Sequence, residues 1–388
     1  MVKHVPYAPG ASPLLAEQAA ALGRLACRLD DCAYEAIQLD LRGAAYYLRP
    51  YLFPAEQPEY ARRVDRLPSL QRIFQQFFYL GRSVSVADLV AALGDDVVGT
   101  LAGLRLCALA HGRARLSPWY LGTYDGAKFF ATSPHAAAGD DLVYVGTETY
   151  YLVRQMGAVR GGVLDLGCGT GLVGILAARQ SLCREVWATD VSLRACWAAA
   201  TNAALNGIST PHCVDCVDLY GEFATRRFDT VVFNPPFVIV PDGLDVHEAI
   251  AGGPLGIELA VRALRELPAT VSRVVLVACS PGDASGPYLL EAVHELAALR
   301  PELSGTVKIS GRRAFEPNYS REYAQRVAKG VGADGGRDLG YFSAEFHQMF
   351  REHLARNGIT HEYGVSIDLR VPTGWSPAIH IVDTTRPV

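Results

Sequence analysis

The chain has 388 residues, of which 50% are hydrophobic and 20% are charged, and its formal net charge is −4. This composition excludes a mainly disordered protein and allows a large buried core, and the length favours two domains. Basic and acidic residues number 14 and 14 in residues 1–145, and 22 and 26 in the rest. Neither part shows the basic excess typical of a nucleic-acid-binding surface.

The nine cysteines lack the spacing of a small disulfide scaffold, and the first residues do not read as a signal peptide. No uninterrupted apolar run approaches the roughly 20 residues that a membrane helix needs. These features predict a cytoplasmic protein without a membrane partner.

Residues 1–140 are expected to form a smaller, mainly helical domain. Its predicted helices are 14–38, 69–80, 85–94 and 95–110, followed by strands at 114–121 and 128–132 around a turn at 124–126. Two helices and a hairpin in this order resemble a winged helix, a module that can read DNA. Because the charge of this region is balanced, we expect it to pack, to cover a substrate or to form a homodimer rather than to bind nucleic acid.

Residues 141–388 alternate between strand and helix patterns, which is typical of a parallel α/β sheet. The predicted strands are 163–166, 185–190, 212–214, 230–234 and 273–279, with helices at 172–179, 193–206, 255–267 and 287–299. Further strands are expected at 306–310, 364–371 and 378–382, and helices near 321–329 and 343–357. The pattern predicts a doubly wound, Rossmann-like α/β domain.

A glycine-rich turn follows the first of these strands, where residues 163–171 read Val-Leu-Asp-Leu-Gly-Cys-Gly-Thr-Gly. Gly167, Gly169 and Gly171 allow a sharp turn and leave room for a ligand against bare main chain. We therefore expect a cofactor at this turn.

Two cofactors compete for it. Residues 169–174 fit the dinucleotide pattern of a nicotinamide-dependent oxidoreductase, which is a weak signal alone. Asp165 places a negative charge beside the turn, where a pyrophosphate would need positive potential. The same carboxylate complements the sulfonium and ammonium groups of S-adenosylmethionine, so we favour S-adenosylmethionine.

Two more carboxylates follow the next strands. Asp190 ends the second strand, where it can accept hydrogen bonds from both ribose hydroxyls of either nucleoside cofactor. Asp218 follows the third strand, from which it could contact an adenine amino group or serve as an ordinary loop carboxylate.

The sequence Asn234-Pro235-Pro236-Phe237 ends the fourth strand. The two prolines lack N–H donors, so nearby carbonyl groups and the Asn234 amide oxygen are available as acceptors. Such acceptors beside an aromatic ring can hold the NH or NH2 of a flat group and align its nitrogen with an electrophilic methyl. Asn234, Pro235 and Phe237 are the predicted catalytic residues.

At these residues the chain resembles class I S-adenosylmethionine-dependent methyltransferases with an Asn-Pro-Pro-aromatic motif. That group includes release-factor glutamine methyltransferases and several RNA and DNA amino methyltransferases. The resemblance covers about residues 140–280 and implies the fold, the cofactor and the roles of Asp165, Asp190 and Asp218. Residues 144–149 are similar to the family's entry segment, and 247–256 to the stretch before its next helix, with Ala249 in place of a proline.

The pair Cys213 and Cys216, preceded by His212, has no partner pair and lies on a predicted strand, so no metal is assigned. Residues 311–329, within the insertion at about 303–345, hold five basic residues with Tyr319 and Tyr323. This stretch either covers the acceptor or forms a solvated surface segment.

The sequence leaves the methyl acceptor open. The balanced charge favours a planar nitrogen of a small metabolite, amino acid or peptide, and the alternative is an amino group of an RNA or DNA base. A third alternative is a cofactor-binding scaffold without catalysis, in which the Asn234 corner would have no chemical role.

Overall fold

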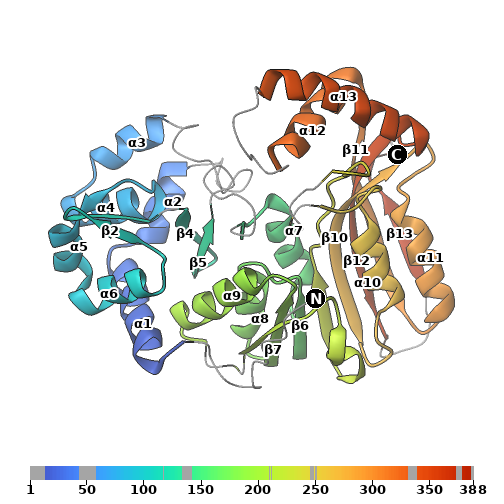
Figure 1. Ribbon diagram of the computed structural model, residues 1–388. Helices are drawn as coiled ribbons and strands as arrows, with labels where there is room; N and C mark the ends of the chain where they lie inside the picture. Colours follow the sequence, from blue (N-terminus) through green and yellow to red (C-terminus); the bar gives the residue numbers. More distant parts are fainter. Residues whose placement is uncertain are drawn as a thin grey trace. The chain divides into compact units, whose positions relative to one another are not determined.

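The computed structural model describes residues 14–42, 58–116, 118–132, 142–208, 210, 212–244, 249, 251–330, 339–372 and 378–385 (Figure 1). The chain divides into two compact units. Unit 1 consists of Met1–Thr147 and Cys168–Cys216, and unit 2 of Glu148–Gly167 and Val217–Val388. The predicted domain boundary near residue 140 stays a prediction.

Unit 1 begins with helices in the predicted regions. Helix α1 (Ala16–Asp31) and helix α2 (Tyr34–Arg42) replace the single predicted helix, because Ala33 between them has a left-handed φ of 52°. Helix α3 (Pro58–Asp65) and helix α4 (Ser69–Phe74) follow, and α4 continues as the π-helix η3 (Gln75–Tyr79). Apolar side chains of these helices form a buried core that includes Leu22, Leu25, Leu29, Phe74, Phe77 and Phe78.

A small antiparallel sheet comes next. Strand β1 (Val84–Ser85), helix α5 (Val86–Leu93), helix α6 (Asp95–Gly103), strand β2 (Ala108–Ala110) and strand β3 (Arg113–Arg115) give the strand order β1-β3-β2. Ser85 caps α5 by accepting a hydrogen bond from the Asp88 N–H. Two helices followed by a hairpin agree with the predicted module. The hairpin, however, is formed by β2 and β3 and not by the predicted strands 114–121 and 128–132. The winged-helix assignment stays a prediction.

Strand β4 (Trp119–Tyr124) and strand β5 (Ala127–Thr132) form a separate hairpin around the predicted turn. Asp125 and Gly126 both have positive φ, 51° and 73°, as a two-residue turn of the primed type requires. Every residue of both strands is buried, so other parts of the chain cover both faces of the hairpin.

Unit 1 also contains part of the α/β domain. Helix α8 (Leu172–Ala178) is followed by strand β7 (Cys183–Asp190), helix α9 (Leu193–Leu205) and strand β8 (His212–Cys216). Strands β7 and β8 are parallel, with α9 as the crossover between them.

Unit 2 contains helix α7 (Thr147–Met156) and six strands in the order β13-β11-β12-β10-β9-β6. Their bounds are β6 (Gly161–Leu166), β9 (Thr230–Phe233), β10 (Arg273–Gly282), β11 (Ser304–Ala314), β12 (His361–Arg370) and β13 (Ile379–Asp383). Strands β6, β9 and β10 are parallel, and β12 is antiparallel to both of its neighbours. The position of β12 as an antiparallel strand between β10 and β11 was not predicted.

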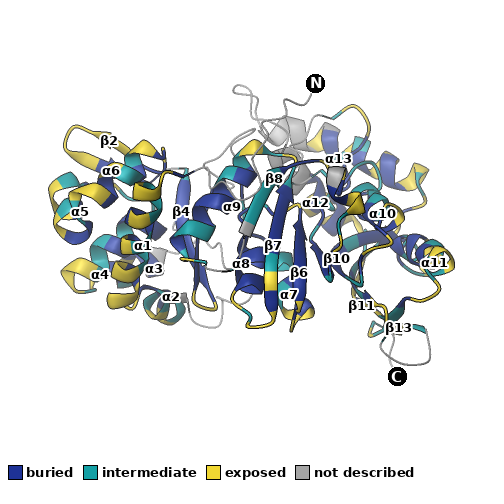
Figure 2. Ribbon diagram, turned by 90° about the horizontal axis from the view of Figure 1, so that it is seen from below, coloured by how far each residue is buried: buried dark blue, intermediate teal, exposed yellow. Residues whose placement is uncertain are grey.

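The remaining elements of unit 2 are the 3-10 helix η5 (Gly221–Thr225) and helices α10 (Glu258–Arg265), α11 (Leu289–Leu299), α12 (Pro317–Gly330) and α13 (Leu339–Arg356). The strands are largely buried, whereas the helices keep exposed outer faces (Figure 2). The predicted α/β, Rossmann-like class is confirmed. No helix among the described residues is long and apolar enough to span a membrane.

Candidate active site

The glycine turn after β6 takes backbone conformations that favour glycine. Gly167, Gly169 and Gly171 have φ of 61°, 52° and 74°. A Cβ on Gly167 would lie 3.0 Å from Cε2 of Phe233, and one on Gly171 would lie 2.9 Å from Cβ of Ala199. No atom of the described residues outside the turn lies within 4 Å of the Cβ position of Gly169. Packing therefore requires Gly167 and Gly171, and Gly169 leaves main chain accessible to a ligand.

Asp190 holds this turn from the end of β7. Its Oδ2 accepts a hydrogen bond from the Gly169 N–H at 2.9 Å, and its Oδ1 accepts one from the Ser192 N–H at 3.0 Å. The predicted ribose acid and the glycine turn thus form one preorganised part of unit 1.

Asp165 and Asn234 lie at the carboxyl ends of two neighbouring strands of unit 2. Asp165 is buried on β6 opposite Val232 of β9, and Leu166 pairs with Phe233, the residue before Asn234. Ligands of open α/β sheets bind at this edge. The strand register therefore places both predicted residues where a cofactor and an acceptor would be expected.

Asp218 forms an ion pair and is not an isolated loop carboxylate. Its Oδ2 lies 2.9 Å from Nη2 of Arg262 on α10, and both side chains are exposed. The hydrogen bond with Asp218 raises the pKa of Arg262. The adenine contact of Asp218 stays a prediction.

The Asn234 side chain has one anchored end and one unpaired end. Its Nδ2 lies 3.4 Å from Oγ1 of Thr149 on α7, which belongs to the predicted entry segment. Its Oδ1 is buried and has no hydrogen-bond partner among the described residues. A buried acceptor without a donor is costly, so it indicates a site built for a ligand N–H.

A second glycine-containing loop, residues 252–256, packs against the backbone that follows the Asn-Pro-Pro-Phe corner. A Cβ on Gly252 would lie 2.7 Å from Cα of Phe237, and one on Gly256 would lie 2.7 Å from its carbonyl oxygen. The Gly252 N–H donates to the Val238 carbonyl at 2.9 Å. Gly252 and Gly256 of the predicted 247–256 stretch therefore allow this loop to pack directly against the backbone of Phe237. Residues 247 and 248 lie outside the described residues.

The 303–345 segment differs from the expected cover. Residues 304–314 form strand β11 of the sheet, so only the part after it can cover an acceptor. Tyr319 and Tyr323 of α12 are buried in an aromatic cluster with Phe350 of α13. Tyr323 is a support for the corner, because its hydroxyl accepts a hydrogen bond from the Ile239 N–H at 3.0 Å. Burial raises the pKa of Tyr323 well above its ordinary value.

Asn202 of α9 is a site residue that the sequence analysis missed. It is fully buried, its Oδ1 accepts from the Phe130 N–H of β5 at 2.7 Å, and its Nδ2 donates to the Phe130 carbonyl at 3.0 Å. The same Nδ2 donates to the Thr170 carbonyl in the glycine turn at 2.9 Å. The sequence did contain a signal for Asn202, because an asparagine on the buried face of a predicted helix needs hydrogen-bond partners for its amide.

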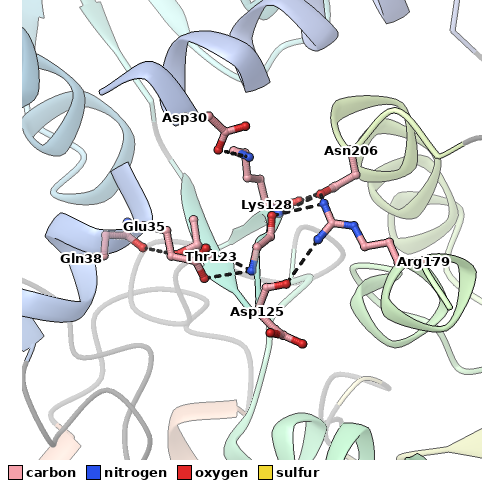
Figure 3. Close-up of polar contacts among 9 residues, drawn as sticks. Asp30, Glu35, Gln38, Thr123, Asp125, Lys128, Arg179 and Asn206 are labelled. Atoms are coloured by element: carbon pink, nitrogen blue, oxygen red, sulfur yellow. Dashed lines mark hydrogen bonds and ion pairs between the residues drawn. The ribbon is translucent and has the colours of Figure 1, made fainter. Parts of the chain in front are cut away.

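Asn206, one helical turn later, repeats this pairing further along β5 (Figure 3). Its Oδ1 accepts from the Lys128 N–H at 3.0 Å, and its Nδ2 donates to the Lys128 carbonyl at 2.6 Å. The Lys128 side chain is buried and reaches Asp30 of α1 at 2.7 Å. Glu35 of α2 accepts from the Gly126 N–H, and burial raises the pKa of its carboxyl. Polar contacts thus join α1, α2, the hairpin and α9 within unit 1.

The predicted cysteine pair lies on β8. Cys216 is buried, and its Sγ lies 3.2 Å from the Val191 carbonyl oxygen; Cys213 is half-buried. The His212 side chain lies outside the described residues.

The comparisons with known proteins agree with this geometry. Residues 143–253, which contain the glycine turn, Asp190, Asp218 and the Asn234 corner, match the family described as "Methyltransferase small domain". This match supports the predicted class, a class I S-adenosylmethionine-dependent methyltransferase, and the predicted cofactor.

Several curated relatives carry the name "Ribosomal RNA small subunit methyltransferase C". The protein from Enterobacter sp. (strain 638) is 28% identical over 199 residues, which cover 48% of this chain and 56% of that protein. The protein from Actinobacillus succinogenes is 30% identical over 162 residues, covering 39% and 46%. The chain therefore spans about half the length of the curated relatives that it matches.

Solved structures show only partial similarity to the chain, with TM-scores below 0.5. Trm5b from Pyrococcus abyssi is 14% identical, with a TM-score of 0.37 and coverage of 68% of this chain and 62% of that chain. A SAM-dependent methyltransferase from Agrobacterium tumefaciens is 18% identical, with a TM-score of 0.32 and coverage of 50% and 65%.

The names of the curated relatives contradict one expectation. The predicted small-molecule or peptide partner is wrong, because these relatives are ribosomal RNA methyltransferases. The expectation rested on the balanced charge of residues 1–145, and a balanced total does not reveal how the charges are distributed along the chain.

Proposed function

We propose that this protein transfers a methyl group from S-adenosylmethionine to an amino nitrogen of an RNA base. The observation that carries the proposal is the buried, unpaired Oδ1 of Asn234. An exocyclic amino group is planar and offers N–H donors, which this oxygen and the carbonyl groups beside Pro235 can accept. The names of the curated relatives support RNA as the acceptor.

One set of residues would hold the cofactor and another would orient the acceptor base. Asp165, Gly169 and Asp190 are the groups that would hold the cofactor, and their donors and acceptors fit its ammonium, sulfonium and ribose. When bound, S-adenosylmethionine supplies an electrophilic methyl group that the amino nitrogen attacks, leaving S-adenosylhomocysteine and one proton. Adenine-side contact by Asp218 would require it to share or release Arg262.

Asn234 and Phe237 would orient the acceptor. Acceptance of an N–H by Oδ1 of Asn234 directs the nitrogen, and Nδ2 of Asn234 is held near Thr149. Phe237 is half-buried and could stack against the face of the base. A base can reach such a corner only when it is unpaired or flipped out of its helix, as RNA and DNA base-modifying enzymes require. We place the reaction in the cytoplasm.

The direct test uses the full chain with radiolabelled S-adenosylmethionine and three acceptors: protein-free small-subunit ribosomal RNA, transfer RNA and duplex DNA. We expect label in an N-methylated nucleoside after digestion of the ribosomal RNA. Label confined to the DNA, or no label in any of the three acceptors, would contradict the proposal.

The Asn234→Ala variant separates binding from chemistry. Because the amide orients the acceptor rather than the cofactor, affinity for S-adenosylhomocysteine should stay nearly unchanged while turnover falls roughly 100-fold or more. Calorimetry and single-turnover kinetics measure the two effects. The control is Asn318→Ala, which removes an exposed asparagine amide on α12 and should change neither. Normal turnover in Asn234→Ala would make the corner structural.

A further inference from the structure

The basic residues of the N-terminal region are concentrated between residues 60 and 116. This stretch holds eight of the 14 basic residues of positions 1–145 but only four of the 14 acidic ones. The residues are Arg62, Arg63, Arg66, Arg72, Arg82, Arg105, Arg113 and Arg115 against Asp65, Asp88, Asp95 and Asp96. The balanced total of the region therefore hides a positively charged module.

Strand β3 presents two of these arginines on one face. Arg113 and Arg115 are exposed, and Ala114 between them is buried on the opposite face. Side chains two residues apart on a strand point to the same side of the sheet. The small β1-β3-β2 sheet thus has an apolar inner face and a basic outer face.

Both guanidinium groups are positioned without being neutralised. Nε of Arg115 donates to the Gly81 carbonyl at 3.0 Å, and Nε of Arg113 donates to Oγ of Ser83 at 3.2 Å. Arg113 also donates to the Ser83 carbonyl. Neither has a carboxylate partner among the described residues, and each guanidinium has five N–H donors in all. Oriented arginines that keep their charge are well suited to phosphate oxygens.

Two further arginines lie in and beside the segment that anchors Arg113 and Arg115. Arg82, between Gly81 and Ser83, reaches Asp65 at 2.9 Å at the end of α3. The next residue, Arg66, is exposed and has no carboxylate partner in the described part of the chain. We call Arg66, Arg82, Arg113 and Arg115 the arginine strip.

The neighbouring helix does not share this charge. Helix α6 begins with Asp95 and Asp96, and Asp96 pairs with Arg24 of α1. In a winged helix that reads bases, the corresponding helix enters the major groove. An acidic helix start disfavours this mode, whereas the strip favours contacts to the backbone of a nucleic acid.

We propose that the arginine strip binds the phosphate backbone of the RNA acceptor. Arg66, Arg113 and Arg115 are exposed and have no carboxylate partner among the described residues, whereas Arg82 is half-buried and paired with Asp65. RNA phosphates supply the charge that complements the three exposed arginines. This inference rests on the proposed function, because it assumes that the acceptor is RNA. It assigns the N-terminal module to substrate docking without sequence reading.

The test compares RNA binding of three double variants over a series of salt concentrations, with protein-free small-subunit ribosomal RNA as the probe. Arg113→Gln with Arg115→Gln removes two phosphate contacts, so the slope of log K against log salt should become less steep by about 1.4 to 1.8. Affinity at low salt should fall at least about 10-fold. Arg113→Lys with Arg115→Lys keeps both charges and should retain most of the affinity.

The matched control is Arg24→Gln with Arg28→Gln, which makes the same charge change on exposed positions of α1. It should leave the salt slope unchanged. Affinity for S-adenosylhomocysteine should be equal in all variants, which shows that each one folds.

Two results would overturn the inference, and they are distinguishable from failure of the proposed function. If the parent chain methylates RNA but the glutamine variant binds it with an unchanged slope, the strip is not the docking surface. If the lysine variant loses as much as the glutamine variant, the arginines are structural. If the parent chain neither binds nor methylates RNA, the proposed function fails and this inference fails with it.

Discussion

Asp190 shows how one side chain can serve both the fold and a ligand. It accepts hydrogen bonds from the Gly169 and Ser192 N–H groups, and these bonds fix the carboxylate at the edge where the cofactor is expected. The neighbouring prediction, Asp218, shows the converse. Its motif position matches the family, yet its carboxylate is paired with Arg262, a residue far along the chain that no local pattern connects to it.

The Asp190→Ala variant tests the ribose contact. Loss of a carboxylate that accepts from two hydroxyls should cost about 2 kcal/mol or more of binding, or roughly 30-fold in the affinity for S-adenosylhomocysteine. Titration calorimetry measures it. The control is Asp229→Ala, which removes a bond of the same type, to the Gly162 N–H at 2.8 Å near the start of β6. Equal affinity in the two variants would contradict the assignment of Asp190.

At the scale of elements, the β4–β5 hairpin is attached to the α/β part of unit 1 by helix α9. Asn202 pairs with main-chain groups of Phe130 on β5, and Asn206 pairs with those of Lys128 (Figure 3 shows the Asn206 contacts). Asn202 adds a bond to Thr170 in the glycine turn. The hairpin that the sequence suggested as a wing is therefore a packing element next to the cofactor turn.

The Asn202→Ala variant tests this attachment. It would leave three main-chain groups without their partner, namely the Phe130 N–H and the carbonyls of Phe130 and Thr170, and should destabilise the protein by roughly 2 to 4 kcal/mol. Cofactor affinity should also fall, because the turn loses a constraint. Chemical denaturation and calorimetry measure the two effects.

The control for Asn202 is Asn206→Ala. Asn206 holds the hairpin but makes no hydrogen bond to the glycine turn among the described residues, so its variant should lose stability while cofactor affinity changes little. The same loss of cofactor affinity in both variants would show that the hairpin as a whole, and not Asn202, supports the turn.

At the scale of the whole molecule, cofactor choice should appear as a shift in thermal stability. S-adenosylhomocysteine at 100 times its Kd should stabilise the native state by about 2.7 kcal/mol and raise the melting temperature. A dinucleotide should not, because Asp165 adds negative charge where a pyrophosphate would lie. Thermal unfolding with each ligand at equal concentration distinguishes them. A larger shift with nicotinamide adenine dinucleotide would reverse the cofactor assignment.

The sequence alone determined the class of the protein. The strands, the glycine turn, Asp190 and the Asn234 corner are local signals, because backbone conformation and hydrophobic period depend on nearby residues. Strands β6 to β10 accordingly lie where they were predicted. The antiparallel place of β12 was not predicted, because strand order depends on contacts between segments far apart in sequence.

Only the tertiary structure revealed which acceptors are left unpaired, which acids are paired and which arginines share one exposed face. The Asp218 and Arg262 pair and the Asn202 bonds join residues tens of positions apart, and the lack of a partner for Oδ1 of Asn234 depends on what the folded chain places around it. Balanced charge over 145 residues suggested a small-molecule acceptor, whereas the fold places Arg113 and Arg115 together on one exposed face. Electrostatic recognition depends on the arrangement of charges in space, which a sum over the sequence does not contain.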